Sequence, residues 1–375
     1  MAYTVVDNPK AHFDVKTYQG TSSTKTISGI AFKPDMIWTK DRTEAYEWGC
    51  YDSSRGVLKW IQTNHAQSQT ATNDITSTAN DRGVASFTSD GFTIQNMTAD
   101  PIGNKNGNQY AAWMWKANGA SKTTNNAGAN GASIASVYQA NTTSGLSIVE
   151  YTGTGSAGTL KHGLSVKPKC IMIKRLDTTS SWQIYHGDTG LVTDPQTDSL
   201  SFDTTAGAAD DATVWNDTIP TTSVFTVGTH AASNASSGKY VAYVFAETKG
   251  FSNFGTYFGV TNNALGPFVY TGFRPSMVII KRQDGAESWQ IADTARTQIV
   301  KDNSQGIQGN LIEEKLVLDA ATAENSTSGD IDFYSNGFKP RDTDGIHNWT
   351  NYKYIYMAFS EASIVGTNGT IALAF

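Results

Sequence analysis

The chain has 375 residues, a formal net charge of −6 and only 17% charged residues, so its length allows two or three domains that each bury a core. The basic residues form no run of five or more, which argues against a nucleic-acid-binding surface. Aromatic residues reach 11%, and glycine, serine, threonine and asparagine are abundant. This composition is typical of β-structure with many turns rather than of helical or disordered chains.

The cysteines and the apolar segments indicate the cellular compartment in which we expect the chain to fold. Cys50 and Cys170 lie far apart and in no CxxC arrangement, so we expect two buried thiols rather than a disulfide framework or a zinc site. No apolar run approaches the roughly 20 residues that a membrane span needs. The amino-terminal residues lack the basic and apolar regions of a signal peptide. We therefore expect synthesis in a cytoplasm and no membrane insertion.

The first predicted elements are strands. Phe13, Val15 and Thr17 alternate with polar residues and are expected to share one face. The next strand follows Pro34, because proline lacks the backbone donor of a strand interior and is tolerated where a strand begins. Its short apolar run, residues 36–38, is bounded by charge and predicts a strand covered on both faces.

A hairpin and a closing strand are expected next. An Asp-Gly pair at residues 90–91 lies between two apolar segments and predicts the hairpin. The closing strand is expected within residues 107–116, and its alternation assigns one set of side chains to each face. We expect Tyr110, Ala112 and Met114 on one face, and Ala111, Trp113 and Trp115 on the other.

A block of nine residues occurs three times, at 32–40, 166–174 and 273–281. Each copy has a proline at its third position, an apolar run and a final lysine, and a tryptophan follows the proline by 14 residues. These anchors are Pro34 and Trp48, Pro168 and Trp182, and Pro275 and Trp289. The fixed spacing predicts a structural unit that is repeated three times.

The second and third units follow the order of the first, with opening strands at 146–151 and 254–257 and closing strands at 238–247 and 354–361. Residues 311–316 have helical character, and the apolar tail is expected to add an edge strand or to dock on a neighbour. A segment rich in glycine, alanine and asparagine is predicted to be a linker or surface loop. The predicted boundaries are 1–117 for the first sandwich with its lead-in, 118–143 for the linker, 144–249 for the second sandwich, and 250–375 for the third with its tail, 362–375.

Several motifs resemble a known family. They are Phe-Lys-Pro-Asp-x-Ile-Trp-x-Lys, Asp-Ser-x-Arg-Gly, Ser-Asp-Gly-Phe-Thr and Tyr-Ala-Ala-Trp-x-Trp-Lys-Ala. Over residues 13–365 the chain resembles a triplicated β-domain of unknown function that recurs in structural proteins of tailed bacteriophages, particularly marine ones, such as tail-fibre proteins. The resemblance implies a place on a virion, at the tail or the head. It transfers no catalytic residue, because the family has none assigned.

Charged residues recur at one position beside the tryptophan strand. They are Asp52 and Arg55, His186 and Asp188, and Asp293 and Arg296. In the structural interpretation, a carboxylate and a guanidinium pair and fix a loop. In the alternative, the position is a glycan site, where a carboxylate accepts hydrogen bonds from sugar hydroxyls and an aromatic ring stacks on the sugar. Repetition across units favours architecture over a single catalytic centre, so we prefer the structural interpretation.

Other residue types give no sign of catalysis. The six histidines have no metal-ligand spacing. The polar residues 100–108 lack the ordered carboxylates of a dedicated calcium site, although bound calcium stays open. Glu313 and Glu314 are adjacent and are expected on a solvated face rather than as the separated carboxylates of a glycosidase. We predict no catalytic residue, no metal and no cofactor.

The sequence therefore predicts an all-β protein of three tandem antiparallel β-sandwich units, of jelly-roll or lectin-like type. The expected function is that of a non-enzymatic virion protein, a fibre- or spike-type component that is assembled in the host cytoplasm. Its polar loops, 62–82, 194–211 and 296–309, are expected to contact a host-surface glycan or protein. Other virion proteins are expected partners, and a homotrimer is favoured by analogy. The alternatives are a head-attached decoration or fibre protein and a carbohydrate-active tail protein.

Overall fold

The computed structural model describes residues 5–69, 83–95, 102–187, 195–261, 266–296, 311–325, 331–341 and 343–361. Its sheets are built from antiparallel strand pairs. Within these ranges there are two α-helices, α1 (Ala212–Trp215) and α2 (Ala231–Asn234), of four residues each. The predicted all-β sandwich class is confirmed. Among the described residues, no helix is long and apolar enough to cross a membrane.

Three sheets share one strand order. In the first sheet, β1 (Phe13–Gln19), β7 (Gln109–Trp115), β3 (Met36–Asp41) and β4 (Gly49–Asp52) are neighbours in that order. The second contains β10 (Leu146–Thr152), β17 (Lys239–Phe245), β12 (Cys170–Arg175) and β13 (Gln183–His186). The third contains β18 (Ser252–Phe258), β26 (Lys353–Phe359), β20 (Met277–Arg282) and β21 (Gln290–Asp293). We call these the inner sheets of unit one (5–117), unit two (118–249) and unit three (250–361).

The registers of the three inner sheets also correspond. Trp115 lies opposite Met36, Phe245 opposite Cys170, and Phe359 opposite Met277. A stacked tyrosine pair joins the opening strand (β1, β10 or β18) to the closing strand (β7, β17 or β26) in every unit, with ring centroids 5.0–5.3 Å apart. The pairs are Tyr18 with Tyr110, Tyr151 with Tyr240, and Tyr257 with Tyr354.

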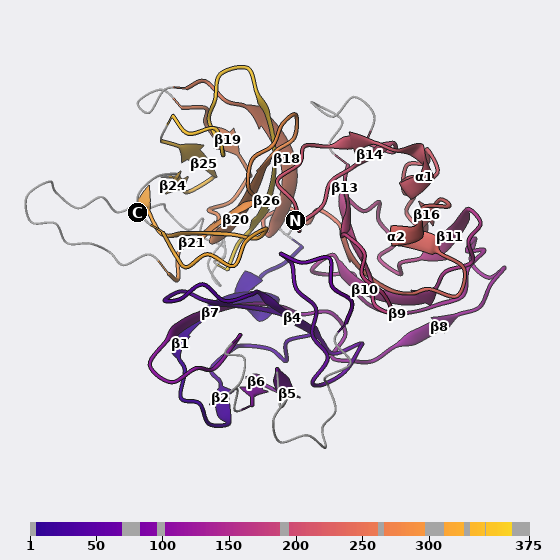
Figure 1. Ribbon diagram of the computed structural model, residues 1–375, viewed down its shortest axis with the longest axis horizontal. Helices are drawn as coiled ribbons and strands as arrows, with labels where there is room; N and C mark the ends of the chain where they lie inside the picture. Colours follow the sequence, from indigo (N-terminus) through magenta and orange to yellow (C-terminus); the bar gives the residue numbers. More distant parts are fainter. Residues whose placement is uncertain are drawn as a thin grey trace, which may run out of the picture.

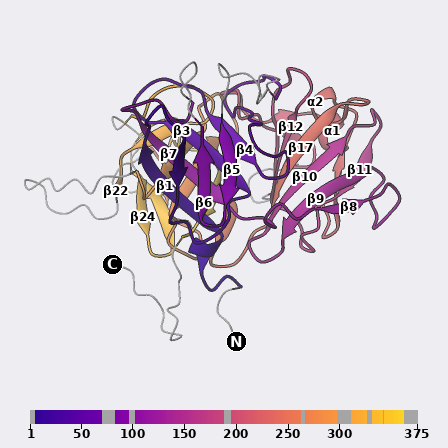
Figure 2. The ribbon, with the colours of Figure 1, turned by 90° about the horizontal axis from the view of Figure 1, so that it is seen from below.

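A smaller outer sheet covers each inner sheet. Unit one has β2 (Lys25–Ile27), β6 (Gly91–Ile94) and β5 (Val84–Thr88). Unit two has β11 (Gly158–Lys161) and β16 (Val224–Val227). Its short pair β14 (Asp198–Ser199) and β15 (Ala209–Asp210) is a separate sheet, and β14 lies next to β13 of the inner sheet. Unit three has β19 (Val269–Tyr270), β25 (Gly337–Pro340), β24 (Ile331–Tyr334) and β22 (Leu311–Ile312). In Figure 2, which looks onto unit one from below, β5 and β6 lie in front of the inner strands.

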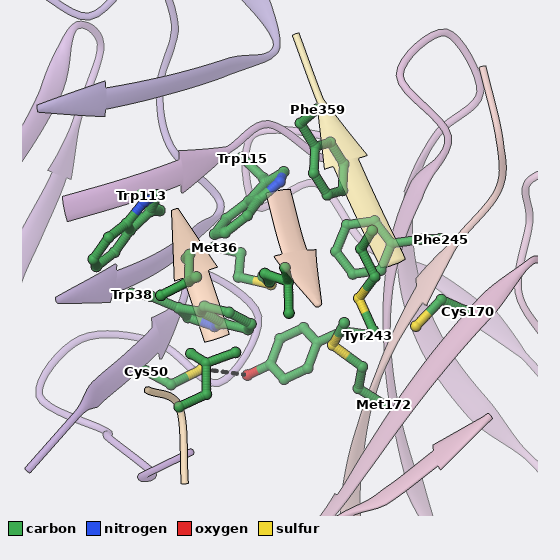
Figure 3. Packing of buried hydrophobic residues seen from close by; sticks show 14 of the residues in the cluster. Met36, Trp38, Cys50, Trp113, Trp115, Cys170, Met172, Tyr243, Phe245 and Phe359 are labelled. Carbon is green, nitrogen blue, oxygen red and sulfur yellow. Dashed lines mark hydrogen bonds between the residues drawn. The ribbon is translucent and has the colours of Figure 1, made fainter. Parts of the chain in front are cut away.

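The inner sheets surround a common centre (Figure 1). Along β7, Ala111, Trp113 and Trp115 point into a core shared by all three units, whereas the alternate residues point into the sandwich core of unit one. The predicted division of the two faces is therefore confirmed. The shared core takes Trp38 and Trp48 from unit one, Met172 and Phe245 from unit two, and Ile279 and Phe359 from unit three. Figure 3 shows several of these side chains meeting.

Burial of both faces explains the apolar runs. All six residues of β3 are buried, as the run after Pro34 predicts, and the Asp-Gly pair forms the β5–β6 hairpin. A fully buried aromatic side chain contributes about 1.5–3 kcal/mol relative to an exposed one, so the shared core is a principal source of cohesion between the units.

Two predictions about local structure are wrong. The predicted linker 118–143 contains β8 (Thr123–Asn125) and β9 (Ser136–Asn141), and β9 pairs with β10 over six residues. The glycines there lie in the turns around these strands, whereas Asn125 and Asn141 are the last residues of β8 and β9. Residues 311–316 form β22 and the start of β23 (Lys315–Val317) instead of a helix, because Ile312 packs in the core of unit three and Leu316 in the shared core. The tail 362–375 lies outside the described residues.

Candidate functional site

The three anchor tryptophans join neighbouring units. Their side chains are fully buried, and each indole Nε1 donates to a backbone carbonyl oxygen of another unit. Trp182 bonds Gln62 at 2.8 Å, Trp289 bonds Ser201 at 2.7 Å, and Trp48 bonds Val317 at 2.8 Å. The acceptors lie in segments that we call strap one (61–69), strap two (200–208) and strap three (316–325).

Each strap pairs first with its own inner sheet and then contacts the next unit. Its first residue bridges to the last strand of that sheet, as Ile61 does to Cys50. Farther along, Gln69 N donates to Leu176 O at 3.1 Å, Ala208 N to Gln283 O at 2.7 Å, and Glu324 N to Arg42 O at 3.0 Å. Strap one thus reaches unit two, strap two reaches unit three, and strap three returns to unit one. The contacts close into a ring.

A buried lysine binds each strap from the unit that receives it. Lys174 Nζ donates to Ala66 O at 2.9 Å, Lys281 Nζ to Thr205 O at 3.0 Å, and Lys40 Nζ to Ala321 O at 3.1 Å. Burial lowers the pKa of all three amines to about 8, because the interior disfavours their charged form. These lysines are the final residues of the repeated block, so the sequence places the same charge at each seam.

The Asp52–Arg55 pair lies at the seam between units one and two, which we call the one–two seam. Asp52 is fully buried and its Oδ1 accepts from Arg55 N at 2.7 Å, while the two side chains form an ion pair. Tyr243 of unit two donates to Asp52 Oδ2 at 2.6 Å, and Arg55 Nη2 donates to the Tyr243 hydroxyl at 3.3 Å. Burial raises the pKa of Tyr243 well above its ordinary value. The pair fixes a loop, as the structural interpretation expects, and also joins two units.

The equivalent pair lies at the three–one seam. Asp293 Oδ2 accepts from Arg296 Nε at 2.6 Å and from Trp113 Nε1 of unit one at 2.9 Å. Arg296 Nη1 also bonds Glu324 Oε1 at 2.8 Å, and the guanidinium faces the Trp113 ring at 5.3 Å. Burial and the two carboxylates act in opposite directions, and the pKa of Arg296 is raised.

His186 has the corresponding place at the two–three seam. Its ring is buried, and Nε2 lies 3.1 Å from the Tyr356 carbonyl oxygen of unit three. The structure therefore distributes the candidate residues over three seams instead of collecting them in one site. Because Asp52 and Asp293 are 0% exposed, a sugar hydroxyl has no access to them, and the glycan interpretation has no support at these residues. Asp188 lies outside the described residues.

Of the loops expected to face the host, some residues pack between units and others lie outside the described residues. Residues 62–69 and 200–208 belong to straps and pack on neighbouring units, and Arg296 is buried. The remainder of 62–82 and of 296–309 lies outside the described residues. The role of these loops stays a prediction.

A cleft of about 570 Å³ opens at the one–two seam. Arg55, Lys59 and Gln69 line it from unit one. Unit two supplies the other wall from β8, β9 and β10, from the loop after β12 and from the start of β17, with Thr124, Ser136, Glu150, Leu176, Asp177 and Lys239 among its residues. Of the lining residues, only Arg55 belongs to a position that the sequence singles out, and the others come from segments far apart in the chain, so the sequence does not indicate the cleft.

Within the described residues, no group of three or more histidine, cysteine, aspartate or glutamate side chains is placed to hold a metal ion. Cys50 and Cys170 are buried thiols, as predicted.

The fold and its seams define a class of all-β proteins in which three sandwich units close around one core within a single chain. The chain belongs to the family defined by a domain of unknown function, DUF7483, whose model matches residues 8–363. Neither a curated protein nor a solved structure matches it.

Proposed function

We propose that the chain is a non-enzymatic structural protein of a tailed-bacteriophage virion, a fibre- or spike-type component that presents polar surfaces to a host glycan or protein. The proposed place on a virion rests on the motif resemblance to structural proteins of tailed bacteriophages. The proposed mechanical role rests on the closed ring of seams between the three units. Three tryptophans, three lysines and three straps join the units in sequence and back to the first. A scaffold of this kind resists shear between its units, which is what an adhesive appendage requires.

The charged residues that recur in the sequence support a structural role. Asp52, Arg55, Asp293 and Arg296 are buried in seams and bound to one another or to aromatic side chains of a second unit. Buried carboxylates that are paired with arginine suit architecture better than glycoside hydrolysis, which requires two carboxyl groups flanking a bound glycosidic bond, one of them with a raised pKa. We therefore place the carbohydrate-active alternative below the structural one. The proposal includes assembly with other virion proteins, as a homotrimer by analogy.

The test is the position of the subunit on purified particles. Gold-labelled antibodies against the chain, followed by a reconstruction of the intact virion, locate it directly. Density at the tail is the expected result, and it also gives the copy number. Density on the head selects the head-attached alternative. A chain that is absent from particles and present only in the infected-cell lysate refutes the proposal.

A further inference from the structure

The three seams are equivalent in backbone but different in side chains. At the three–one seam, Arg42 of unit one crosses to Glu324 of strap three, with Nε–Oε2 2.8 Å and Nη2–Oε2 2.6 Å. The backbone contact between Glu324 and Arg42 corresponds to the one between Gln69 and Leu176 at the one–two seam. There, leucine stands in place of arginine and glutamine in place of glutamate.

This exchange leaves the one–two seam open. Leu176 has no charged group that could reach strap one, and Gln69 Oε1 instead accepts from Arg55 Nη1 at 3.1 Å. Both side chains line the cleft of about 570 Å³, a volume in the ordinary range for small-ligand sites. The Arg42–Glu324 ion pair at the three–one seam shows how the equivalent position can be bridged.

Unit two adds a wall that the inner sheets of units one and three lack among the described residues. β8 and β9 extend its inner sheet beyond β10, and Thr124 and Ser136 from these strands line the cleft. Ser136 is only 4% exposed, and its Oγ has no hydrogen-bond partner among the described residues. A buried hydroxyl without a partner is costly, so this position favours a ligand that offers a polar atom.

The charge balance of the cleft is positive. Glu150 is paired with Lys122 at 2.8 Å, Asp177 with Arg175 at 2.7 Å, and Arg55 with Asp52. Lys59 and Lys239 also line the cleft and are exposed. Neither lysine forms an ion pair with a side chain that the structure describes. Two unneutralised ammonium groups beside hydroxyl and amide groups suit a ligand that carries both negative charge and hydroxyls.

We propose that the one–two seam cleft binds an acidic saccharide, with Lys59 and Lys239 on its anionic groups and Gln69, Thr124 and Ser136 on its hydroxyls. The inference rests on the proposed adhesive function and specifies the ligand class. It assigns recognition to residues outside the repeated Asp–Arg position.

The test measures binding of oligosaccharides to the full chain by titration calorimetry. The probes are hexasaccharides of a polyuronate, of a sulfated galactan and of a sialylated or phosphorylated glycan. Each is compared with a neutral counterpart: the carboxyl-reduced polyuronate, the desulfated galactan and the uncharged form of the third glycan. The expected result is binding of at least one acidic probe and a loss of about tenfold or more for its neutral counterpart. Affinity should also fall as salt is added, because the lysines are exposed.

Two variants remove the site in different ways. Lys59→Glu/Lys239→Glu reverses its charge and should weaken acidic-probe binding by about 100-fold or more. Leu176→Arg/Gln69→Glu reproduces the Arg42–Glu324 bridge, occupies Gln69 and places an ion pair across the cleft; it should also weaken binding, while keeping the thermal stability of the native chain. Lys167→Glu changes another exposed lysine, which lies outside the cleft, and serves as the control.

The inference is overturned if no acidic probe binds at millimolar concentration, if neutral counterparts bind as tightly, or if folded cleft variants bind as the Lys167→Glu control does. Circular dichroism and thermal unfolding establish that each variant is folded. If the chain is found on the virion but its cleft binds no acidic saccharide, only this inference fails and the proposed function stands. If the chain is absent from the particle, the proposed function fails.

Discussion

The two buried ion pairs, Asp52–Arg55 and Asp293–Arg296, allow the cost of removing an aspartate to be compared at two equivalent positions of one chain. Asp52→Ala leaves the Arg55 guanidinium, whose side chain is 1% exposed, with neutral partners among the residues that the structure describes: Gln69, the Cys50 carbonyl and Tyr243. Asp293→Ala leaves Arg296 equally buried, but Glu324 still accepts from it at 2.8 Å. The first substitution therefore strands a charge and the second does not.

The magnitudes follow from that difference. Removing one partner of a buried ion pair costs about 3–5 kcal/mol, which we expect for Asp52→Ala. A hydrogen bond to a charged group contributes about 1.5–3 kcal/mol, so the remaining Glu324 contact should make Asp293→Ala cheaper by roughly 1–2 kcal/mol. The double variant Asp52→Ala/Arg55→Met removes the stranded charge and should recover a large part of the loss.

Urea unfolding monitored by tryptophan fluorescence and by circular dichroism measures these differences. The expected order of unfolding free energies is native, then Asp293→Ala, then Asp52→Ala, with the double variant above Asp52→Ala. A cost for Asp293→Ala that equals or exceeds that of Asp52→Ala refutes the reasoning about Glu324. Costs below about 1 kcal/mol for both refute burial of the pairs.

Three further predictions concern the seams and the core. Trp48→Phe, Trp182→Phe and Trp289→Phe each leave a strap carbonyl without its indole donor and should cost similar amounts, about 1–3 kcal/mol in urea unfolding; a loss confined to one of them contradicts the equivalence of the seams. Burial lowers the pKa of Lys281 to about 8, whereas an unfolded lysine titrates near 10.4. Between about pH 8 and 10.5, Lys281 is deprotonated in the folded state and still protonated in the unfolded state, so the free energy of unfolding of the native chain should rise by up to about 3 kcal/mol relative to that of Lys281→Met. A difference between the two free energies of unfolding that does not change over this pH range contradicts the prediction. Burial raises the pKa of the Cys50 thiol to about 12, so a thiol reagent at pH 8 should label Cys50 and Cys170 only in denaturant, and rapid labelling of the native chain would show that the core is open.

The sequence predicts the features that depend on local alternation. The two faces of β7 and the buried run of β3 follow from side chains two residues apart. The Asp–Arg pairs are also local, because their members are three residues apart. In contrast, β8 and β9 lie in a turn-rich stretch whose composition conceals two short strands.

The seams were beyond sequence reasoning for a different reason. Trp48 and the carbonyl of Val317 are 269 residues apart, and Arg42 and Glu324 are 282 apart, so no local pattern connects them. The same holds for the cleft, whose two lysines occupy unremarkable surface positions in sequence. Leu311–Ile312 became a strand because tertiary packing prevails over weak helical preference in a short segment.

The central claim is that three sheets share one core and that their seams close into a ring. Differential scanning calorimetry of the full chain tests it most directly, because a common core couples the units during unfolding. The account predicts a single transition with a ratio of van 't Hoff to calorimetric enthalpy of about 1. Three separable transitions, or a ratio of about one third, would contradict it.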